Sequence, residues 1–177
     1  NRNAYLKHFP IDKYVDFVVN RQHSAWDWTQ AEQHGKWIES AYLSAVQGDD
    51  KELLIKAESV LNRIIDSQEA NGYVGATAKS FRSPERPVRG MDAYELYFVF
   101  HAFITVYEET GDKKALTAAE KLADYFLQYF GPGKLEFWPS DLRAPENNQK
   151  HLDGHSDFAG HSVHYSWEGT LLCDPIT

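Results

Sequence analysis

Two stretches of the sequence repeat one plan of paired helices, and this repeat restricts the fold more than any other feature. The first is "SAYLSAVQGDDKELLIKAESVLNRIIDSQEANG" (residues 40–72) and the second is "HAFITVYEETGDKKALTAAEKLADYFLQYFGPG" (residues 101–133). Their offset of about 62 residues is typical of a helical hairpin with a long loop rather than of a short solenoid unit. Each stretch predicts two helices joined by a Gly-Asp turn and followed by a glycine-containing stop.

Apolar residues in the second helix of each stretch recur at spacings of three and four. They are Leu53, Leu54, Ala57, Val60, Leu61, Ile64 and Ile65 in the first stretch, and Leu116, Ala119, Leu122, Ala123, Phe126 and Leu127 in the second. A helix with one apolar face needs a neighbour to cover it, so the pattern predicts hairpins stacked side by side. We expect Gly48 and Gly111 to end the leading helices, and Asp49 and Asp112 to cap the trailing ones.

The expected fold class is all-α, because only short pieces such as "GYVGAT" suggest a strand. Two long loops, "NGYVGATAKSFRSPERPVRGMDA" and "GPGKLEFWPSDLRAPENNQKHLDGHSDFAG", follow the hairpins, and loops of this length are usually functional or disordered. Hairpins whose long loops emerge at one end form an (α/α) toroid, with inner helices around a pit and loops at its mouth. About two and a half hairpins are visible, so we expect an incomplete ring: a lead-in at residues 1–25 and the N-terminal part of an (α/α) barrel at residues 26–177.

Charge and composition exclude several classes of partner. The formal net charge is −8 with a pI near 5.4, and no basic stripe is present, so neither nucleic acid nor an anionic membrane is expected as a partner. No apolar run approaches the roughly 20 residues that span a bilayer, and no signal peptide is visible. The single cysteine, Cys173, excludes an intrachain disulfide and leaves the compartment open. An aromatic content of 14% mildly favours a carbohydrate site, although large helical cores also use aromatic residues.

The stretch "WDWTQAEQHGKWIESAYLSA" places aromatic and polar residues just ahead of the first inner helix. Trp26, Trp28, Glu32 and His34 would then lie at the rim of the pit, where an indole stacks on a sugar and a carboxylate accepts hydrogen bonds from its hydroxyls. The alternative is that the two tryptophans only plug the end of the hairpin.

The second inner helix is expected to start at "MDAYELYFVFHAFI". Asp92 can cap it, and Tyr94 and Glu95 fall in its first turn, where the helix N-terminus favours an anion. His101 lies two turns deeper. These residues are candidates for sugar binding, although a histidine on an apolar helix is more often a satisfied core group.

A third inner helix is expected to start within "HLDGHSDFAGHSVHYSWEGTLLCDPIT". This segment contains four histidines: His151, His155, His161 and His164. His164 and Glu168 are four residues apart and share one helical face. Their spacing matches no compact zinc signature, so sugar-hydroxyl recognition is the preferred interpretation and no metal site is predicted here. Glycoside hydrolysis usually needs two carboxylates facing one anomeric carbon, and Glu32, Glu95 and Glu168 occupy comparable positions, though acidic residues at helix starts are also common caps.

Three segments in order resemble the N-terminal half of the catalytic domain of glycoside hydrolase family 127, the β-L-arabinofuranosidases. They are "GKWIESAYLSAVQGDDKELLIKAESVLNRIIDSQEANGYVG", "ELYFVFHAFITVYEETGDKKALTAAEKLADYFLQYFG" and "GHSVHYSWEGTLL". The resemblance runs from about Trp26 to the end of the chain, and the ordered set is more specific than any single motif. It implies an (α/α)6 barrel, which agrees with the hairpin interpretation.

The resemblance can be carried over position by position in the two inner helices. Glu32 and the segment Gly35-Lys36-Trp37 match the family's Glu-His-Val-Gly-Lys-Trp, and Glu95-Leu96-Tyr97 matches its His-Glu-Leu-Tyr. Tyr94 stands in place of the family's histidine and Phe98 in place of its cysteine, which implies a changed sugar pocket. His101 matches the Gly-His that follows.

The third segment departs more from the family. His164 and Glu168 fall near the Gly-His-Pro-Glu-Ile-Glu segment, with Tyr165, Ser166 and Trp167 different.

The family's catalytic groups are a zinc-bound cysteine nucleophile and a glutamate acid/base, which the resemblance places downstream of this sequence. Cys173 has a different context and is not assigned the role of nucleophile. We therefore expect no cofactor in this chain, zinc in a full-length member, and no hydrolytic activity of the chain alone. The resemblance favours a periplasmic or extracellular location, and an incomplete ring is expected to self-associate through its uncovered apolar face.

The leading hypothesis is part of a glycoside hydrolase for arabinose-containing or related plant-type glycans, with this chain supplying the sugar-binding rim. A non-catalytic helical module that binds a carbohydrate or a protein is the alternative. A third hypothesis is an unsaturated uronide hydrolase or a sugar epimerase of similar shape. For the uronide enzyme, the basic residues at the pit mouth would be Lys79, Arg82, Arg86 and Arg89.

Overall fold

The computed structural model describes residues 2–21, 32–88 and 92–135, and these ranges are helical without a β-strand. The helices are α1 (Arg2–His8), α2 (Ile11–Asn20), α3 (Glu32–Gly48), α4 (Lys51–Asp66), α5 (Asp92–Thr110) and α6 (Lys113–Tyr129), with a short 3₁₀ turn, η1 (Lys79–Phe81). The all-α prediction is confirmed.

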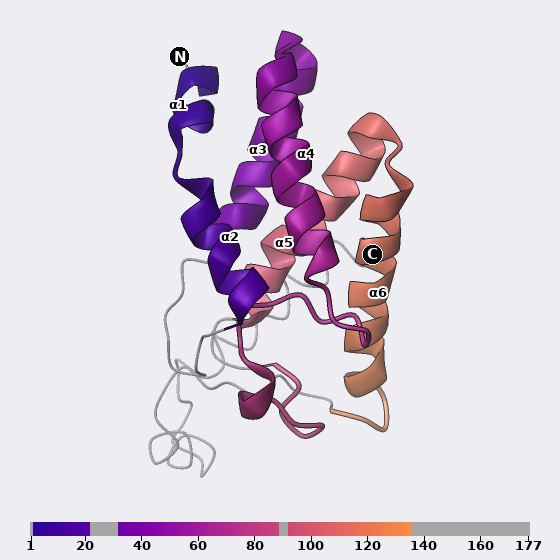
Figure 1. Ribbon diagram of the computed structural model, residues 1–177. Coiled ribbons are helices and arrows are strands. Elements are labelled where there is room, and N and C mark those ends of the chain that lie inside the picture. The colour runs from indigo at the N-terminus through magenta and orange to yellow at the C-terminus, as the bar shows by residue number, and fades with distance from the viewer. Residues whose placement is uncertain (1, 22–31, 89–91, 136–177) are drawn as a thin grey trace, which may run out of the picture.

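The helices form two antiparallel hairpins, α3 with α4 and α5 with α6 (Figure 1). Helices α3 and α5 pack on each other as one layer, α4 and α6 each cover their own hairpin partner, and α1 and α2 lie along α3 and α4. The short turns of both hairpins lie at one end of the molecule, whereas α4 ends and α5 begins at the other end (Figure 1). This inner-and-outer arrangement is the one expected of a helical toroid, and closure of the ring remains a prediction.

The two turns confirm one predicted cap and correct the other. In the second hairpin, Gly111 has a φ of 74° and Asp112 caps α6, its side chain accepting a hydrogen bond from the Lys114 amide at 2.8 Å. In the first hairpin, the predicted cap Asp49 is wrong, because Asp50 caps α4 and accepts from the Leu53 amide at 3.1 Å.

In both turns one residue in the left-handed conformation lies between the helix end and the next cap, which is a common way for a helix to end. Gly48 stays helical, and Asp49 takes that conformation with a φ of 47°. Aspartate tolerates this region better than most residues, since its short polar side chain can hydrogen-bond locally.

The buried positions of α4 recur in α6 about 62 residues later, at the offset of the sequence repeat. The buried positions of α4 and α6 that correspond are Leu53 and Ala115, Ala57 and Ala119, Val60 and Leu122, and Ile64 and Phe126. The prediction of Leu127 as a core residue is wrong, because it points away from the hairpin and is 57% exposed. Each outer helix therefore contributes a single apolar stripe that faces its partner.

The two inner helices approach most closely at Gly35. A Cβ atom placed on this residue would lie 2.5 Å from the carbonyl carbon and oxygen of Phe98 and 2.8 Å from the Val99 amide nitrogen. Only glycine lets the α3 and α5 backbones come this near. The glycine therefore fixes the spacing of the layer that would line the pit.

None of the helices in the described part of the chain has the length and apolar character needed to cross a membrane.

Candidate functional site

A row of half-buried side chains runs along the side of α3 and α5 that α4 and α6 do not cover. On α3 the half-buried positions include 36, 39 and 43, and on α5 they include 97, 98, 101 and 104, so both recur at helical spacing. We call the set Lys36, Glu39, Tyr97, Phe98 and His101 the inner face. In a toroid this side of the inner helices looks into the pit.

Contacts across the two helices hold the inner face together. The Lys36 ammonium lies 4.3 Å from the centroid of the Phe98 ring, which is a cation–π distance. The Tyr97 and His101 rings stand 5.9 Å apart. Nδ1 of His101 lies 3.1 Å from Oε1 of Glu39. The inner face thus offers a cation, an anion, an imidazole and two aromatic rings on neighbouring helices.

His101 was predicted as a sugar-binding residue, and its surroundings leave it accessible for that role. The His101 side chain is 42% exposed, although its Nδ1 atom is shielded from solvent. It is therefore neither a core histidine nor a freely solvated one.

Glu95 lies in the first turn of α5, as predicted, but it is 2% exposed and faces the protein interior rather than open solvent. Tyr94 precedes it in the same turn, and Glu32 is the first residue of α3. The two helix starts lie on adjacent inner helices, and the pairing of their carboxylates stays a prediction.

The other predicted site residues, Trp26, Trp28, His164 and Glu168, lie outside the described residues. The meeting of Glu32, Glu95 and Glu168 at one sugar therefore remains a prediction.

His34 differs from its expected place at the rim. It belongs to α3, is 1% exposed, and neither of its ring nitrogens has a hydrogen-bond partner within the described residues. Burial lowers the pKa of His34 to about 3, so the imidazole stays neutral at physiological pH. Its spacing of three and four residues from Trp37 and Ile38, both buried, is the sequence signal that places it inside.

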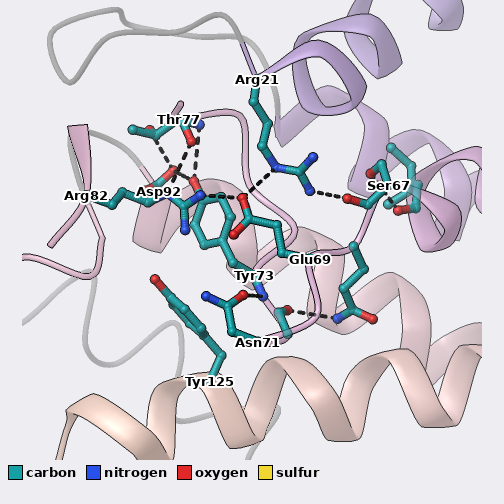
Figure 2. A network of polar contacts seen from close by, with 12 residues as sticks. Arg21, Ser67, Glu69, Asn71, Tyr73, Thr77, Arg82, Asp92 and Tyr125 are labelled. Atoms are coloured by element: carbon teal, nitrogen blue, oxygen red, sulfur yellow. Dashed lines mark hydrogen bonds and ion pairs between the residues drawn. The ribbon is translucent and has the colours of Figure 1, made fainter. Parts of the chain in front are cut away.

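A buried polar network ties the loop after α4 to the start of α5 (Figure 2). Oδ1 of Asp92 accepts hydrogen bonds from the Tyr73 hydroxyl at 2.8 Å and from the Thr77 hydroxyl at 3.0 Å. The Thr77 amide in turn donates to the Tyr73 hydroxyl oxygen at 3.1 Å. Burial and the Asp92 charge raise the pKa of Tyr73 well above its ordinary value, which keeps its hydroxyl protonated and donating.

Arg82 completes this network from the side of the loop. Its guanidinium pairs with Glu69 and lies 3.5 Å over the Tyr73 ring, and its Nε donates to the Thr77 carbonyl at 3.2 Å. Nε of Arg21 reaches the same Glu69 carboxylate at 3.2 Å (Figure 2).

The Arg82 side chain is only 5% exposed, so it is not available to an acidic sugar at the pit mouth. Of the other basic residues considered for a uronide enzyme, Lys79 is exposed, Arg86 is half-buried, and Arg89 lies outside the described residues. Arg82 is therefore excluded from the four cations that the uronide hypothesis places at the pit mouth.

The described ranges do not provide a zinc site, because no three His, Cys, Asp or Glu side chains within them come together as metal ligands. The histidines at positions 151–164 and Cys173 lie outside these ranges.

Comparison with known proteins gives consistent matches. The model of the β-L-arabinofuranosidase GH127 catalytic domain matches residues 3–138. A curated relative, the non-reducing end β-L-arabinofuranosidase of Bifidobacterium longum subsp. longum, is 29% identical over an alignment of 104 positions that covers 55% of this chain and 16% of the relative.

Two solved structures show the same fold. A GH127 β-arabinofuranosidase has a TM-score of 0.55 and 24% identity, over 73% of this chain and 23% of that chain. A GH127 β-L-arabinofuranosidase from Geobacillus stearothermophilus T6 has a TM-score of 0.56 and 16% identity, over 92% of this chain and 30% of that chain.

These relatives are several times longer than the matched region, since this chain spans 16% of the bifidobacterial protein and 23% and 30% of the two solved chains. The match to the family model nevertheless includes both hairpins and the loop between them. The chain therefore belongs to the family of GH127 β-L-arabinofuranosidase catalytic domains.

Proposed function

We propose that this protein serves the hydrolysis of arabinose-containing or related plant-type glycans, and that the inner face of α3 and α5 is part of its sugar-binding surface. The observation that carries the proposal is the coincidence of two facts. Residues 3–138 match the GH127 catalytic domain, and within them the uncovered side of the inner helices carries hydrogen-bonding and aromatic groups beside the aliphatic Leu43 and Ile104.

The chemistry of the inner face suits a sugar. A furanoside presents hydroxyls that both donate and accept hydrogen bonds, together with C–H faces that pack on aromatic rings. The His101 imidazole accepts a hydrogen bond from a hydroxyl, the Lys36 ammonium donates to another, and Tyr97 supplies a ring beside His101. Binding and orienting the sugar is the contribution that these residues can make.

Cleavage of the glycosidic bond needs further groups. The family resemblance places the zinc, the cysteine nucleophile and the glutamate acid/base downstream of this sequence, and the described residues contain no cysteine. In this proposal the described hairpins bind and orient the sugar and do not break the bond.

The test is a titration of the 177-residue chain, followed by NMR, with methyl β-L-arabinofuranoside. The α-anomer and methyl glucoside serve as ligand controls. We expect saturable binding of the β-arabinoside and a loss of about tenfold in His101→Phe, which removes one hydrogen bond. Trp28→Ala tests the predicted rim, and Tyr5→Phe, on exposed α1, is the matched control that keeps wild-type affinity.

A folded wild-type chain that binds none of these sugars would overturn the proposal. Incubation with a chromogenic β-L-arabinofuranoside separates binding from catalysis, and release of the chromophore by this chain would contradict the expectation that the described hairpins only bind.

A further inference from the structure

We infer that Glu39 is a positioning residue for His101: it holds the imidazole proton on Nδ1, so that Nε2 accepts a hydrogen bond from a sugar hydroxyl. The inference deepens the proposed function and rests on it. It assigns a role to a carboxylate that lies one helical turn after Gly35 and pairs across the two inner helices.

The geometry of the pair gives the two edges of the ring different surroundings. Nδ1 of His101 is shielded from solvent and lies 3.1 Å from Oε1 of Glu39. The side chain is nonetheless substantially exposed, so its exposed surface lies on atoms other than Nδ1. In this conformation Nδ1 has no aligned hydrogen-bond partner, so the proposed role requires the two side chains, already 3.1 Å apart, to turn toward each other.

The chemistry of the two groups then fixes the tautomer. A neutral imidazole has one donor nitrogen and one acceptor nitrogen, whereas an ionised carboxylate only accepts. Glu39 therefore favours the proton on Nδ1 and leaves the lone pair on Nε2, in the way that carboxylates orient metal-binding histidines. The lone pair on Nε2 accepts a hydrogen bond, and a sugar hydroxyl is the donor that the proposed function supplies.

The framework around the pair is rigid enough to position it. The close backbone contact of Gly35 with Phe98 lies one turn from Glu39 and one turn from His101, so the separation of the helices is fixed where the pair forms. The Tyr97 ring lies beside the imidazole on the same helix, with 5.9 Å between the ring centroids. Sites built on packed helices hold their side chains more precisely than sites on loops.

The first experiment reads the tautomer directly. The chain is labelled with ¹⁵N-histidine, and the ring nitrogens of His101 are observed at about pH 8, where an ordinary imidazole is neutral. We expect the proton on Nδ1 in the wild type, retention in Glu39→Gln because the amide oxygen still accepts, and a shift toward Nε2 in Glu39→Leu. Glu120→Leu, which removes an exposed carboxylate on α6, is the matched control and leaves the spectrum unchanged.

A proton on Nε2 in the wild type, or an unchanged tautomer in Glu39→Leu, would overturn the inference. Because this readout needs no ligand, it decides the role of Glu39 even if the proposed function fails.

The second experiment connects the pair to sugar binding. We expect Glu39→Leu to weaken binding of methyl β-L-arabinofuranoside about tenfold, as His101→Phe does, and the double variant to lose no more than either single one. Glu39→Gln is expected to restore most of the affinity. If the double variant instead loses the product of the two single effects, Glu39 does not act through His101. Absence of sugar binding in the wild type would refute the proposed function and leave the tautomer result standing.

Discussion

The buried, neutral His34 makes the stability of this protein sensitive to mild acid, and the substitution His34→Leu should remove that sensitivity. His34 is 1% exposed and has no partner for either ring nitrogen within the described residues. Burial lowers the pKa of His34 from an ordinary 6.5 to about 3. In the unfolded chain the imidazole is solvated and regains its ordinary pKa.

The sign and size of the effect follow from linkage. Below about pH 6.5 the His34 imidazole binds a proton in the unfolded state but not in the folded state. The free energy of unfolding therefore falls as the pH falls. The decrease ends near pH 3, where His34 is also protonated in the folded state. At pH 5, about 1.5 pH units below the ordinary pKa, the loss from this one residue is about 2 kcal/mol, since each unit is worth about 1.36 kcal/mol. The full difference, reached near pH 3, amounts to roughly 5 kcal/mol.

The assay is urea unfolding of the 177-residue chain at about pH 8 and about pH 5, followed by circular dichroism. Carboxylates also titrate in acid, so the measured quantity is the pH-dependent loss in the wild type minus the loss in His34→Leu, expected at about 2 kcal/mol. Ile38→Val, one turn along α3 and also buried, is the matched control, which lowers stability by about 1 kcal/mol at both pH values. An equal acid-induced loss in the wild type and in His34→Leu would refute the argument.

Three further predictions concern stability, each measured by urea unfolding near neutral pH. Gly35→Ala should cost about 2–3 kcal/mol, because the new Cβ would stand 2.5 Å from the Phe98 carbonyl and the gain in helix propensity is smaller than this clash. Tyr73→Phe should cost about 1–3 kcal/mol, since it removes the hydroxyl that donates to the buried Asp92 carboxylate and accepts from a loop amide. Asp50→Ala should cost about 1 kcal/mol through loss of the α4 cap.

Each of these has a matched control on the same helix, residue type or turn. Ser40→Ala on the exposed side of α3 and Tyr5→Phe on α1 should change stability by less than about 0.5 kcal/mol. Asp49→Gly should be neutral or stabilising, because Asp49 has a φ of 47°, which glycine adopts without strain. The argument for Gly35 would be contradicted if Gly35→Ala were as stable as the wild type. The argument for Tyr73 would be contradicted if Tyr73→Phe lost no more stability than Tyr5→Phe. The argument for the cap would be contradicted if Asp49→Gly lost more stability than Asp50→Ala.

Much of the fold was predictable from the sequence, because helical hairpins are encoded locally. Apolar spacing of three and four residues predicts which face of α4 and α6 is buried, and the repeat predicts that the two hairpins pair alike. The errors are also local: Asp49 rather than Asp50 as a cap, and Leu127 as a core residue. Both arise because neighbouring residues of similar chemistry compete for one position, and only backbone geometry decides between them.

The candidate site likewise contains some residues that the sequence could place and others that only the tertiary structure could. Glu95 and His101 could be placed on the second inner helix from the sequence alone, since their positions along that helix depend on residues close by. The pairing of His101 with Glu39, 62 residues earlier, and the burial of His34 were decided by tertiary structure. No local pattern reports how closely two inner helices approach. That distance is fixed where Gly35 meets the Phe98 backbone, and it determines which polar side chains face each other and which are removed from water.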